Sequence, residues 1–242
     1  MSAPTSHRYV PALGHGWLTA AYDPVVRVTT RERAFKRRLL ASARLDDARS
    51  MLDLGCGTGT FAIMAKRAHP MVEVVGLDVD PRVLGSARAK ATAAAVDMTF
   101  VEGSAERLPF SDGMFDRVVS SLFFHHLDIE MKAGAAAEAL RVLSPGGELH
   151  VADWGVPENL LMRVLFLPVQ LLDGFANTND NVRGELLRVF EGAGFERLEK
   201  RGELSTVLGT IAWYCARRPF TDPRDPGQPG RTASRTEPLP PT

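Results

Sequence analysis

Short apolar runs alternate with longer amphipathic segments over most of the chain. Apolar and β-branched residues form runs at 51–54, 72–77, 99–101, 117–121 and 148–152. Between these runs, small and apolar residues recur with helical spacing over 60–68, 81–95 and 131–142. Such an alternation of strands and helices predicts a parallel, doubly wound sheet that is covered by helices on both faces.

Local sequence signals mark the start of one expected helix, the end of another and a later change from helices to strands. Asp80 precedes Pro81, an arrangement typical of a helix cap followed by the first helical residue. The last of the three helices is expected to end before Ser144-Pro145-Gly146-Gly147. Farther on, residues 195–204 and 206–216 form two strand-like segments with no room for a helix between them, so they predict an antiparallel hairpin.

The two ends of the chain differ from its centre. Residues 17–45 are expected to be helical and are locally basic, with Arg27, Arg31, Arg33, Lys36, Arg37 and Arg38. A solvated helix face is the favoured interpretation, and surface binding to RNA or lipid is the alternative. Residues 219–242 are rich in Pro, Arg, Thr and Asp and lack the apolar area that offsets chain ordering, so they predict a disordered tail. The chain therefore divides into an N-terminal helical lid (1–45), one main domain (46–218) and a Pro-rich tail (219–242).

The composition indicates which binding partners and which cellular compartment are expected for the protein. A chain of 242 residues can form one well-buried α/β domain, and its 29 Lys and Arg balance its 29 Asp and Glu, so no overall field draws it to nucleic acid. The apolar run over 160–172 is interrupted by polar residues and is too short for a membrane span, so it predicts a helix of a soluble protein. Cys56 and Cys215 form no paired spacing, and residues 1–13 lack a signal-peptide pattern. These features favour the cytoplasm.

A glycine-rich turn follows the first expected strand. In Asp53-Leu54-Gly55-Cys56-Gly57-Thr58-Gly59-Thr60, three glycines let the backbone turn sharply and approach a ligand closely. The helix that follows would present its positive end to a ligand carboxylate. Thr60 stands where the dinucleotide-binding pattern needs Gly or Ala, and the Lys that nucleotide triphosphatases need is missing. Both of those ligand classes are thus disfavoured.

Further segments in the same order complete a family resemblance. They are Asp78 at the end of the second strand, Glu102-Gly103-Ser104-Ala105-Glu106-Arg107-Leu108-Pro109-Phe110, Phe115-Asp116-Arg117-Val118-Val119 and Arg141-Val142-Leu143-Ser144-Pro145-Gly146-Gly147. With the glycine-rich turn, they resemble the class I S-adenosylmethionine-dependent methyltransferases over residues 51–153, and within them the type 11, ubiquinone/menaquinone C-methyltransferase-like enzymes. The resemblance implies a Rossmann-like, mostly parallel seven-stranded sheet with a C-terminal antiparallel hairpin. The Asn-Asp pair and the Trp-Lys that precede the first strand in quinone methylases are missing, which does not favour a quinone acceptor.

The resemblance also implies a cofactor site. S-adenosylmethionine, which leaves as S-adenosylhomocysteine, would place its methionine end against the turn, and Asp78 would accept hydrogen bonds from both ribose hydroxyls. For Asp78, a capping role at the helix beginning with Pro81 is the alternative. Ser104 replaces an acid of the family pattern, so the Ser104 hydroxyl or the Ala105 backbone would meet the adenine. The residues expected to bind the cofactor are Asp53, Gly55, Cys56, Gly57, Gly59, Asp78, Val79, Ser104, Ala105 and Ser121.

Two histidines follow the fourth strand, at the edge of the sheet where doubly wound folds bind ligands. His126 or His125 would act as a general base for an acceptor that must lose a proton, with Asp153 orienting the ring, and the family pattern favours His126. A turn-packing role for the histidines is the alternative. The resemblance adds Tyr22 as an aromatic residue near the methyl group. No further residues complete a metal-ligand set around the histidines, so no metal is expected.

The expected reaction is methyl transfer, by in-line displacement, to an O, N or C nucleophile of a small apolar or aromatic molecule. Aromatic residues such as Trp17, Phe123 and Trp154 favour an apolar acceptor pocket. A noncatalytic protein that binds S-adenosylmethionine is one alternative, and an RNA methyltransferase is another. Ser120-Ser121-Leu122-Phe123 does not resemble the Asn-Pro-Pro-Tyr type of motif, which disfavours a nucleic acid acceptor. The sequence is compatible with a homodimer but does not define the oligomeric state.

Overall fold

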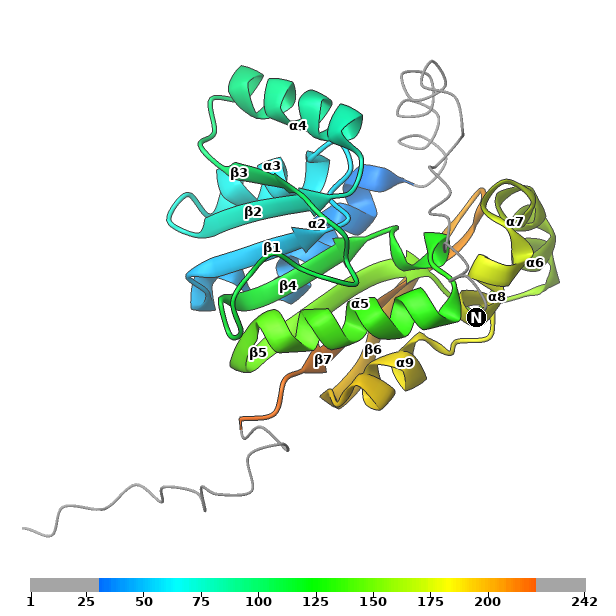
Figure 1. Cartoon of the computed structure of the whole chain (residues 1–242). Helices are drawn as coiled ribbons and strands as arrows, with labels where there is room; N and C mark the ends of the chain where they lie inside the picture. Colours follow the sequence, from blue (N-terminus) through cyan, green and yellow to red (C-terminus); the bar gives the residue numbers. More distant parts are fainter. Residues whose placement is uncertain (1–30, 221–242) are drawn as a thin grey trace, which may run out of the picture.

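The computed structural model describes residues 31–220, in which one seven-stranded sheet lies between two layers of helices (Figure 1). The strands are β1 (Ser50–Leu54), β2 (Glu73–Asp78), β3 (Thr99–Glu102), β4 (Phe115–Ser121), β5 (Leu143–Trp154), β6 (Glu196–Thr206) and β7 (Gly209–Arg217). Their order is β3-β2-β1-β4-β5-β7-β6. Strands β1 to β5 pair in parallel, and β7 pairs antiparallel with both β5 and β6. The Rossmann-like sheet with a C-terminal antiparallel hairpin is confirmed.

The helices divide between the two faces of the sheet. They are α2 (Glu32–Ala43), α3 (Thr60–Ala68), α4 (Pro81–Ala93), α5 (Ile129–Val142), α6 (Leu160–Leu165), α7 (Leu167–Asp173), α8 (Phe175–Val182) and α9 (Leu186–Ala193), with 3-10 turns η1 (Leu45–Asp47) and η2 (Phe124–His126). Helices α2, α3 and α4 pack on one face, and α5 and α9 pack together on the other. Helices α6, α7 and α8 gather at one end of the sheet (Figure 1). Asp80 caps α4, as expected, by accepting a hydrogen bond from the Arg82 N–H at 2.8 Å.

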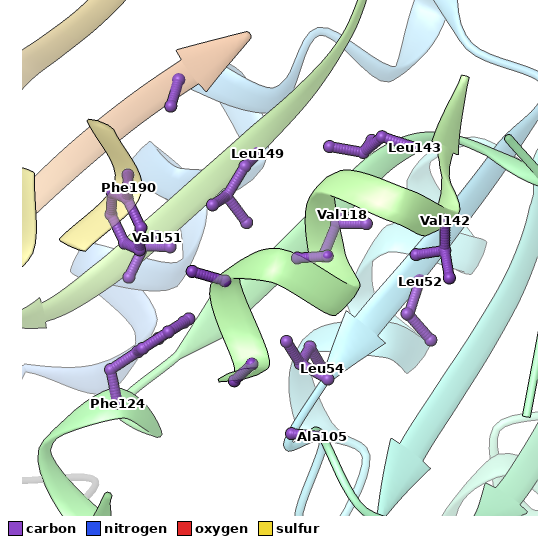
Figure 2. Close-up of a cluster of buried hydrophobic side chains, with 14 of the residues drawn as sticks. Leu52, Leu54, Ala105, Val118, Phe124, Val142, Leu143, Leu149, Val151 and Phe190 are labelled. Carbon is purple, nitrogen blue, oxygen red and sulfur yellow. The ribbon is translucent and has the colours of Figure 1, made fainter. Parts of the chain in front are cut away.

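The core follows from the alternation of side chains along each strand. Leu52, Val118 and Leu149 point toward α5 and α9 (Figure 2), and their neighbours Met51 and Val119 pack on the opposite face against α2 and α3. All of these side chains are at most 1% exposed. Because burying one such apolar side chain contributes about 1.5 to 3 kcal/mol, the two clusters hold the sheet between its helical layers.

The C-terminal hairpin turns two residues later than the sequence predicts. The expected break at Ser205 was wrong, because β6 continues to Thr206 and pairs there with Gly209. The Thr206 hydroxyl donates to the Gly209 carbonyl at 2.7 Å and accepts from the Leu208 N–H at 3.2 Å. This side chain closes the turn, and Gly209 supplies a φ of +131° that other residues rarely adopt.

The apolar run over 160–172 is not the one helix that was predicted. It is divided between α6 and α7, which meet at Phe166. Pro168 explains the break, because it lacks an N–H and its ring would clash with the carbonyl of the preceding turn. Pro168 is tolerated in the first turn of a new helix, where it lies. Strand β5 also begins earlier than expected, at Leu143, with a register irregularity opposite Phe115 and Arg117.

Some sequence predictions lie partly or wholly outside the described residues. Of the expected lid over 1–45, the structure describes α2 and η1, and Trp17 and Tyr22 lie outside the described range. Of the expected tail, only residues 219 and 220 are described. None of the helices within 31–220 has both the length and the apolar character that crossing a bilayer requires.

Candidate active site

The glycine-rich turn connects the end of β1 to the start of α3. Gly55, Gly57 and Gly59 have φ values of +69°, +52° and +72°, the left-handed region that favours glycine. At Gly55 a side chain is also excluded by space, because an added Cβ would lie 2.3 Å from Cδ2 of Phe123. The turn therefore keeps bare backbone facing the ring of Phe123, which comes from the chain after β4.

Asp78, at the end of β2, is bonded to this turn. Its Oδ2 accepts a hydrogen bond from the Gly57 N–H at 2.8 Å, and its Oδ1 accepts from the Asp80 N–H at 3.1 Å. Burial raises the pKa of Asp78, and these backbone hydrogen bonds oppose the shift. Because Asp80 caps α4, the carboxylate of Asp78 is directed to the turn instead of to the helix.

Asp53, the last polar residue of β1, is fully buried. Among the described residues, neither of its carboxylate oxygens has a hydrogen-bond partner, and the Ala62 amide that faces it lies outside hydrogen-bond geometry. Burial raises the pKa of Asp53 to about 7, and the charge of Lys36 on α2 opposes this shift. A buried carboxylate is costly unless a partner satisfies it, and residues 31–220 supply no hydrogen bond to Asp53.

A cavity of about 180 Å³ opens beside the turn at the carboxyl ends of the strands. Of the residues expected to bind the cofactor, Gly55, Asp78, Val79, Ser104 and Ala105 line it. The rest of its lining is Leu77, Gly103, Glu106, Phe123, Leu127 and Met131. Of these residues, only Phe123 was predicted from the sequence to line a binding pocket, that of the acceptor. Leu127 and Met131 follow η2 and look in sequence like ordinary core residues, so no local signal marks them.

The other expected cofactor residues lie outside the cavity lining. They are Asp53, Cys56, Gly57, Gly59 and Ser121. The Cys56 side chain packs against α4 with Leu84 and Phe100, and burial raises the pKa of its thiol. Ser121 ends β4, where it pairs with Ala152 of β5.

His125 and Asp153 form a buried pair at the ends of β4 and β5. The His125 Nδ1 lies 2.7 Å from the Asp153 Oδ1, which also accepts from the Trp154 N–H at 2.7 Å. The Asp153 Oδ2 accepts from the N–H groups of Phe123 and His125 at 3.2 and 3.3 Å. Burial alone would raise the pKa of Asp153, but the charge and hydrogen bond of His125 outweigh it, so the pKa is lowered.

The two histidines differ in their contact with Asp153. The family pattern favours His126, but His125 holds the direct contact with Asp153, and the His126 ring packs on His125 with centroids 3.9 Å apart. Although part of His126 remains accessible, desolvation and the neighbouring His125 lower its pKa to about 3. The reason is local, because Leu122 has a φ of +54° and so redirects the chain between β4 and η2.

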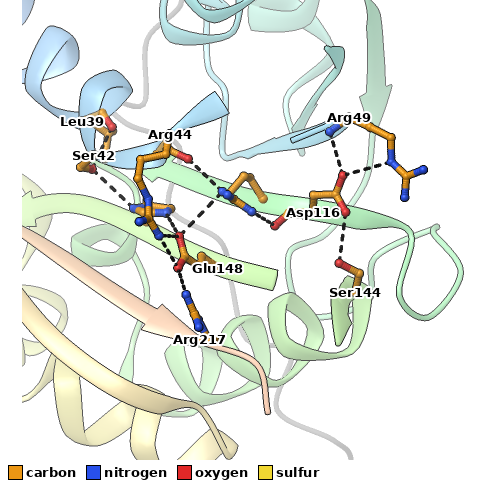
Figure 3. Close-up of polar contacts among 11 residues, drawn as sticks. Leu39, Ser42, Arg44, Arg49, Asp116, Ser144, Glu148 and Arg217 are labelled. Atoms are coloured by element: carbon orange, nitrogen blue, oxygen red, sulfur yellow. Dashed lines mark hydrogen bonds and ion pairs between the residues drawn. The ribbon is translucent and has the colours of Figure 1, made fainter. Parts of the chain in front are cut away.

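A second group of ionisable side chains lies near α2, in the middle of β5 and beside β7 (Figure 3). The Glu148 carboxylate accepts hydrogen bonds from Arg44 at 2.8 Å and from Arg217 at 2.6 Å, and it lies 3.2 Å from the His150 Nε2. Glu148, His150 and Cys215 bring three ligand atoms within 4.8 Å of one another. The guanidinium groups already neutralise Glu148, so this group forms an ion-pair network and does not suit a metal cation.

Comparisons with known proteins agree with this arrangement. A family model described as a methyltransferase domain matches residues 51–147. A demethylmenaquinone methyltransferase of Deinococcus radiodurans is 38% identical over 147 residues, which is 60% of this chain and 60% of that protein. A ubiquinone/menaquinone biosynthesis C-methyltransferase of Syntrophotalea carbinolica is 30% identical over 205 residues, covering 78% of this chain and 85% of that protein. The chain belongs to the class I S-adenosylmethionine-dependent methyltransferases.

A solved structure of low sequence identity shares the fold of this chain. Human N-acetylserotonin methyltransferase in complex with S-adenosylmethionine superposes with a TM-score of 0.63 at 18% identity, covering 84% of this chain and 55% of that one. The chain spans about 60% of the length of the demethylmenaquinone methyltransferase named above. Family membership thus rests on the sequence relatives, and the solved structure supports the fold.

Proposed function

We propose that this chain transfers the methyl group of S-adenosylmethionine to a nucleophile on a small apolar or aromatic molecule. The observation that carries the proposal is the meeting of the Gly55 turn and the Asp78 carboxylate at one cavity, which continues to the residues around η2. The cofactor supplies an electrophilic methyl group on a sulfonium. The protein then has to hold the two reactants in line, which lowers a barrier by about 7 to 11 kcal/mol in favourable cases.

The residues around the cavity fit the parts of this cofactor. A carboxylate has about four acceptor positions, so Asp78 can keep its two backbone hydrogen bonds and still accept from two ribose hydroxyls. Asp53 does not line the cavity, but it belongs to the strand that leads into the turn. Its buried carboxylate, which lacks a hydrogen-bond partner among residues 31–220, would balance the charge of the ammonium group at the methionine end. Ser104 and Ala105 line the cavity and are the proposed contacts of the adenine.

For an acceptor that must lose a proton, we assign His125 as the general base. Asp153 holds the Nδ1 side of the ring, so Nε2 would take up the proton that the acceptor loses. Asp153 is itself fixed by three backbone N–H groups, which keeps the imidazole in one orientation. His126, whose pKa is lowered to about 3, would stay neutral and pack against the base.

The chemistry of the cavity wall favours an apolar acceptor. Phe123, Leu127 and Met131 form its side next to η2, where the acceptor would approach the methyl group. Two relatives are named for quinone substrates, but the chain spans only part of the first of them. The proposal therefore stops at small apolar or aromatic molecules.

Two measurements test the proposal. Calorimetry should show binding of S-adenosylhomocysteine and no binding of NADH. Incubation with S-adenosylmethionine and either 1,4-naphthohydroquinone or catechol should then release S-adenosylhomocysteine, measured by mass spectrometry, above the rate without an acceptor. Absence of S-adenosylhomocysteine binding, or preferential binding of NADH, would refute the cofactor assignment. Binding without release for any acceptor in a wider aromatic panel would contradict the catalytic part.

A further inference from the structure

Helix α8 presents polar side chains to the protein interior. Thr178 and Asn181 are fully buried, and Gln170 of α7, also fully buried, donates to the Thr178 hydroxyl at 3.0 Å. In contrast, Leu160 and Leu171 in the preceding helices are 79% and 73% exposed. An ordinary amphipathic helix has the opposite arrangement, so α8 is held in place mainly by polar contacts and not by an apolar face.

Two of these contacts reach the residues that flank the His125–Asp153 pair. The Asn177 side-chain amide donates to the His126 carbonyl at 3.3 Å, and the Asn181 amide donates to the Trp154 carbonyl at 3.2 Å. His126 is next to His125 in the chain, and Trp154 is next to Asp153. Helix α8 therefore spans the pair and is bonded to the backbone on either side of it.

A buried lysine on α5 ties α8 to this position. Lys132 is fully buried, and its Nζ donates to the Asn177 carbonyl at 2.6 Å and lies 3.3 Å from the Asp180 Oδ2. Placing an ammonium group in the interior costs several kcal/mol unless its partners compensate. Both partners of Lys132 belong to α8, and one of them is the residue that bonds to the His126 carbonyl.

We propose that Lys132 is a positioning residue of the candidate active site, which holds α8 across the His125–Asp153 pair through Asn177 and Asp180 and adds a positive charge beside that pair. This inference rests on the proposed function, because it concerns the histidine assigned there as the base. It assigns a role to a residue that makes no contact with the cavity described above.

Three titratable groups interact electrostatically with the pair: His126 on η2, Lys132 on α5 and Tyr214 on β7. Asp180 on α8 and Asp128, the residue that caps α5, interact in turn with Lys132. Burial lowers the pKa of Lys132, and Asp180, Asp153 and Asp128 oppose this shift, so the lysine interacts electrostatically with the pair as well as with α8. Removal of the lysine charge should therefore stabilise a proton on His125, and removal of the Asp180 charge should have the opposite effect.

The test uses the full chain labelled with ¹⁵N-histidine and follows the His125 ring by NMR, with His125→Gln to assign its signals. In Lys132→Met, the titration midpoint of His125 should rise by roughly half a pH unit or more, and in Asp180→Asn it should fall. The double variant should return close to wild type. Lys66→Met is the matched control, because Lys66 also donates to backbone carbonyls, of Pro70 and Val72, but at the opposite end of the sheet.

Shifts of the His125 midpoint in opposite directions would distinguish the electrostatic role of Lys132 from a general loosening of α8. Loosening would shift the midpoint in the same direction in both variants. Shifts of the same sign, or no shift in either variant, would overturn the inference. If Lys132→Met does not fold, Asp180→Asn alone tests the inference. This variant keeps the lysine and a hydrogen-bond acceptor at position 180, and the titration midpoint of His125 must still fall in it. Calorimetry of S-adenosylhomocysteine binding to the wild type tests the proposed function separately. If no binding were seen, the NMR result on Lys132 would still stand.

Discussion

Asp78 and Asp80 lie two residues apart in the chain but make different hydrogen bonds. Asp78 bonds to the glycine-rich turn, and Asp80 caps α4. We expect Asp78→Ala to weaken binding of S-adenosylhomocysteine by about 1 to 3 kcal/mol, the usual cost of losing a charged hydrogen-bond partner. Calorimetry measures this change.

The matched control for that experiment is Asp80→Ala. It should lower the free energy of unfolding by about 1 kcal/mol through loss of the cap, with the affinity for S-adenosylhomocysteine kept within twofold. Equal affinities in wild type and Asp78→Ala would rule out the ribose contact.

Asp53 makes stability depend on pH in an unusual direction. Its pKa is raised from 3.8 to about 7 by burial, so the folded protein binds the proton more tightly than the unfolded chain does. The free energy of unfolding should therefore fall as the pH rises from about 4 to about 7. Asp53→Asn should remove this loss and stabilise the protein at pH 8 by about 1 to 3 kcal/mol.

The same substitution should weaken S-adenosylhomocysteine binding, because the neutral amide cannot pair with an ammonium group. Urea unfolding at pH 5 and pH 8, together with calorimetry, would show both effects. A variant that is less stable than wild type at pH 8 would contradict the assignment of a buried, unpaired carboxylate.

The short η2 element depends on a neighbouring helix. Phe124 of η2 packs edge-to-face on Phe190 of α9 at a centroid distance of 5.4 Å, and both side chains are fully buried. Phe190→Ala should lower the free energy of unfolding by about 3 to 5 kcal/mol, because it leaves a cavity beneath the histidines. Urea denaturation provides the measurement. Val207→Ala, at a 60% exposed turn position, is the control and should change stability by less than about 0.5 kcal/mol.

Elements with strong local signals could be predicted from the sequence, including α3, the capped start of α4 and the glycine-rich turn. Each of these depends on neighbours in the chain, such as Asp80 before Pro81. The orientation of the histidines could not be predicted, because it depends on the left-handed backbone of Leu122, a conformation that leucine rarely adopts. The polar interior face of α8 could not be predicted either, because its partners, such as Lys132, are distant in sequence.

Across the whole molecule, Glu148 joins elements that are far apart in the chain. Its carboxylate binds Arg44 after α2 and Arg217 at the end of β7, and it lies 3.8 Å from Arg117 of β4. The hydrogen bond with His150 is the largest cause of its lowered pKa, despite burial. Glu148→Gln should lower the free energy of unfolding by about 3 kcal/mol at pH 7, the lower end of the range for a broken buried pair. The buried Arg117 loses its counter-charge, whereas solvent screens the more exposed Arg44 and Arg217.

The pH dependence of this effect has a defined sign. The pKa of Glu148 is lowered in the folded protein, so its contribution is present above about 4.3, the ordinary value for glutamate, and declines as the pH falls below it. The difference between wild type and Glu148→Gln should therefore be smaller at pH 3 than at pH 7. Glu203→Gln, in a partly exposed pair with Lys200, is the control and should change stability by less than about 1 kcal/mol. Equal effects of the two substitutions would exclude a special role for the network.

The order of the last two strands constrains how the protein can be synthesised. Strand β7 is the last strand within residues 31–220, yet it lies between β5 and β6 in the sheet. Until the ribosome has released residue 217, the edge of β5 has no partner there and β6 has nothing to pair with. A nascent chain therefore exposes an open edge that favours aggregation, and nonsense mutations as late as β7 would remove the strand that joins the hairpin to the sheet.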